Sequence, residues 1–99
     1  MAGWVCACAS VAASASAAAK NLPLQADLVQ GYGDDSAEMQ MNNGGTPTIN
    51  LVVPVRYTHA HNGVVNRQDF DQMVELVVAM LMQLDARTVA QLRDFAPAQ

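Results

Sequence analysis

The sequence predicts an α/β fold in which a partial mixed or parallel sheet is flanked by helices. A run of β-branched and apolar residues over residues 48–55 is typical of a buried strand in a parallel sheet. Apolar residues recur at three- and four-residue spacing from Phe70 to Leu84, which indicates an amphipathic helix. Predicted helices and strands alternate along the chain. With so few strands, we expect one sheet edge and one helix face to stay uncovered.

Length and composition allow one small domain or a piece of a larger one. The chain has 99 residues, of which 52% are hydrophobic and 14% charged, so a folded core is favoured over disorder. The formal net charge of -4 argues against nucleic acid as a partner. No apolar run approaches the roughly 18–20 residues that span a bilayer, so no membrane is expected either. Cys6 and Cys8 are too close for an ordinary disulfide and lack a second pair for a metal, so we expect reduced cysteines in a cytoplasmic protein.

Residues 1–21 form a separate segment rich in alanine and serine. The favoured interpretation is an Ala-rich helix over residues 10–21 that is ended by Pro23. A secretory signal is disfavoured, because Lys20 follows the apolar part, whereas a signal peptide needs its positive charge before it. A third interpretation, left open, is that the first dozen residues are not native to the fold.

Residues 22–95 are expected to form the folded part of the chain, and residues 96–99 a frayed tail. Asp34, Asp35 and Ser36 are N-cap candidates for the first helix of this part, and glycine is suited to close it. The predicted elements are, in order, a strand over residues 24–30, a turn over 31–33, a helix over 34–42 closed by Asn43-Gly-Gly45, the strand over 48–55, a loop over 58–65, a helix from about Asn66 to Leu84, and a short helix over 85–92.

Chemically capable side chains follow the predicted strand over residues 48–55. In open α/β sheets, ligands bind beyond the carboxyl ends of strands, and a histidine there can present a ring nitrogen to a metal. His59 and His61 would share a face if they lay on a strand, and then both could reach one ion. The alternative is that each is a hydrogen-bonded polar residue near a strand end. Arg56 and Tyr57 are candidates for binding a substrate carboxylate or carbonyl. The plainer alternative is that they pack their stems and pair with a local carboxylate.

Two further groups of residues, a pair of carboxylates and a set of methionines, are explained most simply by a structural role. The adjacent carboxylates Asp34 and Asp35 are most simply helix caps, although one of them could orient a metal-bound histidine. The methionines Met73, Met80 and Met82 are most simply filler for a core or an interface.

Five short motifs follow one another in order between residues 22 and 69. They are Leu22-Pro-Leu-Gln25, Gly33-Asp-Asp-Ser36, Gly45-Thr-Pro-Thr48, Pro54-Val-Arg-Tyr-Thr-His59 and Val64-Val-Asn-Arg-Gln-Asp69. Together they resemble the C-terminal part of the co-catalytic metallo-aminopeptidases of the deblocking, or tetrahedral-assembling, type. These include glutamyl aminopeptidases and proteins once labelled endoglucanases. The chain is most similar to the aminopeptidases found beside bacterial sugar-transport genes. It departs from the family's Gly-Thr-Asp-Ala motif at Asp34 and Ser36.

The resemblance implies a fragment of a metallopeptidase catalytic domain that removes N-terminal residues from peptides with two divalent metals, zinc, cobalt or manganese. It implies that His59 is the last metal ligand and that Asp35 lies beside the site, near Arg56 and Tyr57. It assigns no ligand role to His61, which departs from the family pattern. The family's other ligands and its general-base glutamate lie upstream. They have no counterpart here, because the chain has a single acidic residue before Gly33.

Three hypotheses follow from these observations. The first is a C-terminal fragment of a metallo-aminopeptidase that is inactive alone, because one histidine cannot hold a two-metal centre. The second is a non-catalytic interaction module that pairs with itself or with a full-length relative through the apolar face from Phe70 to Leu84. The third is a small metal-binding protein that uses His59 and His61.

Overall fold

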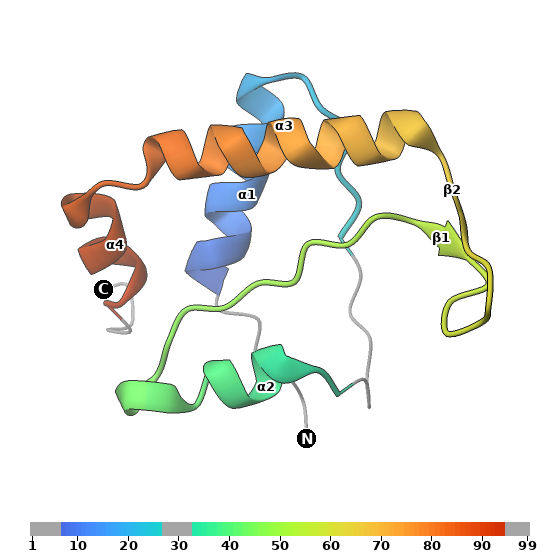
Figure 1. The fold of residues 1–99 in the computed structure, drawn as a ribbon. Coiled ribbons are helices and arrows are strands. Elements are labelled where there is room, and N and C mark those ends of the chain that lie inside the picture. Colours follow the sequence, from blue (N-terminus) through green and yellow to red (C-terminus); the bar gives the residue numbers. More distant parts are fainter. Residues whose placement is uncertain (1–6, 27–32, 95–99) are drawn as a thin grey trace.

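The fold is described by a computed structural model that places residues 7–26 and 33–94. The long helix α3 crosses α1, and an extended stretch of chain runs between α3 and α2 toward a small hairpin (Figure 1). The elements are helices α1 (Ala7–Ala19), α2 (Asp35–Met39), α3 (Arg67–Gln83) and α4 (Ala86–Leu92), the 3-10 helix η1 (Asn42–Gly44), and strands β1 (Val55–Arg56) and β2 (Val64–Val65).

Helix α1 confirms the Ala-rich helix predicted from the sequence and begins three residues before the predicted start. Its end is set by Asn21, whose φ of 52° places it in the left-handed region. The backbone N–H of Leu22 donates to the carbonyl of Ala17 at 2.8 Å, and that of Asn21 donates to Ala18 at 3.1 Å. These two bonds form a Schellman motif, which satisfies the last carbonyls before Pro23 stops the helix.

Helix α3 confirms the amphipathic helix, and its first turn is capped by Asn66. The Asn66 side-chain oxygen accepts a hydrogen bond from the backbone N–H of Gln68 at 2.9 Å. One face of α3 packs against α1, and the buried residues of the described chain lie on these two helices. They are Ala13, Ser16, Ala17, Leu76 and Ala79. Because most of these side chains are small, the two helices approach closely but remove little apolar surface from water.

The predicted strand over residues 48–55 is wrong except at its last residue. Only Val55 of that run lies in a strand, and it pairs with Val65 in a two-stranded antiparallel sheet in which Arg56 pairs with Val64. The second strand falls in the predicted loop, which is therefore also wrong at its end. An extended run becomes a strand only when a neighbour binds its N–H and C=O groups, and Pro54 has no N–H to offer. Among the described residues, no parallel pair of strands supports the predicted sheet.

The remaining predictions are confirmed in part. Helix α2 starts as predicted but ends at Met39, and the glycine in the left-handed region is Gly44, with φ of 78°. Helix α4 confirms the short last helix, with Asp85 as its N-cap. Residues 24–26 form no strand, whereas residues 27–32 and the predicted tail lie outside the described residues. Within the described chain, every helix is too short or too polar to cross a bilayer.

The expected uncovered helix face is confirmed on α3. Large apolar side chains project from it with a third or more of their surface exposed to solvent. They are Phe70, Val74, Val77, Val78, Leu81 and Met82.

Candidate functional site

The loop that joins β1 to β2 carries the side chains to which the sequence assigned chemistry. The backbone N–H of Ala60 donates to the carbonyl of Tyr57 at 3.2 Å, which closes a tight turn with His59 inside it. Tyr57 has φ of 64° and His59 has φ of 63°, so both lie in the left-handed region. Non-glycine residues with positive φ carry backbone strain, and such residues cluster at ligand-binding and catalytic sites.

The side chains at the end of β1 and in this loop are exposed to solvent. Arg56, Tyr57, His59 and His61 are all in the exposed class, and Tyr57 retains 64% of its surface. The guanidinium carbon of Arg56 lies 6.0 Å from the centroid of the Tyr57 ring, within range of a cation–π contact. Arg56 and Tyr57 therefore lie close to each other, and their candidacy for binding a substrate carboxylate or carbonyl stays a prediction. The two histidines lie in a loop, so the strand argument for a shared face does not apply to them.

The carboxylate of Asp34 caps α2 and also holds a second segment of the chain. Its Oδ1 accepts a hydrogen bond from the backbone N–H of Ser36 at 3.0 Å and another from the Ser36 hydroxyl. Its Oδ2 accepts one from the side-chain nitrogen of Asn50 at 2.7 Å. The capping interpretation is thus confirmed for Asp34, while Asp35 is the first helical residue and is exposed. The sequence analysis did not identify Asn50. The one sequence feature that could have pointed to Asn50 is that it is a polar residue within an apolar run.

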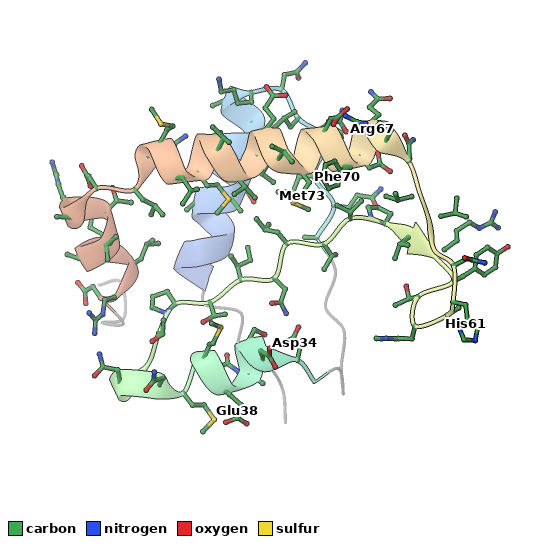
Figure 2. The ribbon with its side chains drawn as sticks, viewed as in Figure 1. Asp34, Glu38, His61, Arg67, Phe70 and Met73 are labelled. Carbon is green, nitrogen blue, oxygen red and sulfur yellow. The ribbon has the colours of Figure 1, made fainter. Side chains whose placement is uncertain are left out.

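The structure does not bring these groups together. Asp34 lies at the start of α2, whereas His61 lies on the hairpin loop at another end of the molecule (Figure 2). Within residues 7–26 and 33–94, no three His, Cys, Asp or Glu side chains gather closely enough to hold a metal ion. The described residues therefore do not fit a complete two-metal centre. The ligand role of His59, the site-adjacent role of Asp35 and the weaker candidacy of His61 stay predictions.

A shallow hollow on the surface lies away from the hairpin. It is lined by Glu38, Met39, Met41 and Asn42, at the end of α2 and the turn after it. None of the residues singled out from the sequence contributes to it, and its open shape offers little enclosure for a small molecule.

Comparison with known proteins connects the sequence motifs to a family. Residues 11–76 match the M42 glutamyl aminopeptidases, a range that includes all five motifs. Over 86 residues the chain is 34% identical to "Putative aminopeptidase FrvX" of Escherichia coli, covering 86% of this chain and 24% of that protein. It is 30% identical to the glutamyl aminopeptidase of Lactococcus lactis over 64% of this chain and 18% of the relative. It is 33% identical to the lysyl aminopeptidase of Pyrococcus furiosus over 64% of this chain and 18% of the relative.

The chain thus spans a quarter or less of the length of these curated relatives. No solved structure shows a significant match to it. The family match nevertheless covers well over half of the chain. The chain therefore belongs to the M42 glutamyl aminopeptidase family.

Proposed function

We propose that this chain is the C-terminal portion of the catalytic domain of a cytoplasmic, metal-dependent aminopeptidase, and that it is inactive alone. The observation that carries the proposal is the family match over residues 11–76, which includes the Arg-Tyr-Thr-His segment ending at His59. M42 peptidases are in general metal-dependent. The whole enzyme would remove N-terminal residues from peptides, with zinc, cobalt or manganese as the metal.

Within that proposal, His59 is the contribution of this chain to the metal centre. Its imidazole is exposed on a turn with a left-handed backbone, so it is accessible to a metal held by other segments. Arg56 and Tyr57 lie beside it and would face the peptide substrate. A two-metal centre needs a bridging carboxylate and several further ligands. Because the described residues gather no such set, the remaining ligands must be supplied by a longer chain or a full-length relative.

The first experiment tests activity of the chain by itself. The purified chain is mixed with aminoacyl p-nitroanilides and zinc, cobalt or manganese, and its metal content is measured by elemental analysis. We expect no hydrolysis above the metal-only background and less than one metal per chain. Hydrolysis that disappears in His59→Ala would contradict the proposed inactivity.

A complementation experiment tests the ligand role of His59. The glutamyl aminopeptidase of Lactococcus lactis, lacking the stretch that matches this chain, is co-expressed with it. We expect bound metal and hydrolysis of a glutamyl anilide to recover with the parent chain and with His61→Ala, but not with His59→Ala. Recovery of metal binding and hydrolysis with His59→Ala would show that His59 is not a metal ligand. Equal losses in both histidine variants would favour the metal-binding hypothesis that uses the pair.

A second candidate function is a non-catalytic interaction module. It is favoured by the uncovered apolar side chains of α3, since contiguous apolar surface of this kind usually marks an interaction site. The partner would be a second copy or a full-length relative. A chain that is monomeric at all concentrations and unfolds cooperatively would contradict this candidate.

A further inference from the structure

The chain contains two Asn-Gly pairs, Asn43-Gly44 and Asn62-Gly63. Asparagine is among the chemically labile residues of proteins. Its side-chain amide can be attacked by the backbone nitrogen of the following residue, and glycine hinders this attack least because it has no Cβ and few forbidden backbone conformations. Both pairs are exposed to solvent, so sequence and exposure do not distinguish them. Their hydrogen bonds do.

The first pair lies in the 3-10 helix η1, within a turn that hydrogen bonds hold closed. The backbone N–H of Gly45 donates to the carbonyl of Asn42 at 3.0 Å, and the Thr46 hydroxyl donates to the same carbonyl at 3.2 Å. The backbone N–H of Thr46 donates to the carbonyl of Gln40 at 3.0 Å. Attack on the side chain of Asn43 requires rotation about its Cα–C bond, which lies inside the rings that these bonds close. The turn must therefore open before the reaction can occur.

The second pair lies in the loop between β1 and β2, where no such short ring encloses it. The turn bond of this loop, from the N–H of Ala60 to the carbonyl of Tyr57, ends before Asn62, and strand pairing resumes only at Val64. Among the residues that the structure describes, no hydrogen bond involves the N–H of Gly63 or the side chain of Asn62. The attacking nitrogen and the amide it would attack are both unrestrained.

We propose that Asn62 is the main site of spontaneous deamidation in this chain, by way of a succinimide. The backbone nitrogen of Gly63 forms a bond to the side-chain carbonyl carbon of Asn62 and gives up its proton. The bond from that carbon to the amide nitrogen breaks, and the nitrogen takes up the proton and leaves as ammonia. Water then opens the succinimide at either carbonyl, which leaves aspartate or isoaspartate at position 62. The inference is independent of the proposed function.

The modification changes the hairpin loop in two ways. Either product adds a negative charge to the loop that carries His59 and His61. Isoaspartate also routes the backbone through the former side chain, so the path of the loop between the strands becomes longer. Asn62 lies outside the paired residues of β1 and β2, so the pairing of Val55 with Val65 does not oppose this change.

The first test is peptide mapping by mass spectrometry of the purified chain during prolonged incubation at neutral pH. We expect position 62 to deamidate about fivefold faster than position 43, because the bonds of the η1 turn must break before Asn43 can react. In urea, where these bonds are absent, the two rates should converge. Equal rates in buffer, or a faster reaction at Asn43, would overturn the proposal.

The second test separates the succinimide route from direct hydrolysis of the amide. In Gly63→Ala, the new Cβ would lie 3.4 Å from Val55 Cγ2, an ordinary contact, and Gly63 does not have positive φ, so the hairpin can accept alanine. The Cβ hinders the attacking nitrogen, and we expect deamidation at Asn62 to slow several-fold. Deamidation at Asn43 in the same chain is the internal control and should keep its rate.

The products give an independent readout in the parent chain. A succinimide yields isoaspartate as well as aspartate, whereas direct hydrolysis yields aspartate alone. Chromatographic separation of the two forms of the peptide that contains position 62 distinguishes these routes, and we expect both forms. Aspartate alone, or an unchanged rate at Asn62 in Gly63→Ala, would overturn the proposal.

Discussion

The side-chain nitrogen of Asn50 lies 2.7 Å from Asp34 Oδ2 and 3.1 Å from the hydroxyl of Ser36. This contact ties the extended stretch before β1 to the first turn of α2. Helix α2 has five residues, far fewer than the roughly 12–15 that an isolated helix needs to be stable in water. The cap and the bond from Asn50 are therefore polar contacts that hold the first turn of α2 in place.

Replacing Asp34 with Ala should loosen α2. We expect a loss of about 1 kcal/mol in local stability, because the cap and the bond from Asn50 disappear together. The measurement is amide hydrogen exchange at Ala37, whose N–H donates to the Asp34 carbonyl. Its exchange should accelerate about fivefold. Asp34→Asn keeps the capping oxygen but turns an amide NH2 toward Asn50, so it loses only that bond and should exchange at a rate between those of the parent and Asp34→Ala. Unchanged exchange in Asp34→Ala would show that α2 is held by other contacts.

The left-handed backbone at His59 predicts a trade-off between stability and metal binding. His59→Gly should be more stable than His59→Ala by about 1 kcal/mol, because glycine adopts positive φ without the strain that a Cβ introduces. Both variants lose the imidazole, so the difference reports the backbone alone. Urea unfolding followed by circular dichroism measures it. Equal stabilities of the two variants would mean that residue 59 does not adopt the left-handed backbone conformation in solution.

The helices were predictable from the sequence because their signals are local. Asn66 caps α3 two residues from the N–H it binds, and Asn21 ends α1 just before Pro23. The predicted strand over residues 48–55 was wrong, because a strand forms only where a partner binds its backbone, and β1 (Val55–Arg56) has its partner at Val64–Val65. For the site, the sequence motifs predicted the family, which is confirmed, and a ligand role for His59, which stays a prediction. The positive φ at His59 and the bond from Asn50 to Asp34 follow from tertiary structure and have no local signature.

Close packing of α1 on α3 should make Ala17 intolerant of a larger side chain. Ala17 keeps 3% of its surface exposed, so leucine there would overpack the interface at a cost of roughly 1–3 kcal/mol. The control is Ala18→Leu, because Ala18 is exposed on the same helix and leucine has a good helix propensity. Thermal unfolding should show a lower midpoint for Ala17→Leu and little change for Ala18→Leu. Similar midpoints for the two variants would argue that α1 does not pack on α3 in solution.

The N-cap of α4 should make the stability of this helix depend on pH. The backbone N–H of Thr88 donates to Asp85 Oδ1 at 2.7 Å. This bond, assisted by the Thr88 hydroxyl, lowers the pKa of the Asp85 carboxyl below its ordinary value of 3.8. Because the folded pKa is the lower one, the stabilisation is fully present above pH 3.8 and is lost as the pH falls through the folded value.

Asp85→Asn separates this effect from the titration of other carboxylates. Asparagine keeps a capping oxygen but has no carboxyl group to titrate. The stability of α4 in this variant should therefore stay constant over the pH range in which Asp85 titrates in the parent chain. The Asp85 carboxyl carbon, followed by NMR from pH 6 to strongly acidic pH, should show a midpoint below 3.8. Amide exchange at Val89, whose N–H donates to the Asp85 carbonyl, should accelerate over the same range in the parent chain and less in Asp85→Asn. A midpoint at or above 3.8 would mean that the bond to Thr88 does not persist in solution, and then α4 would lack its cap at every pH.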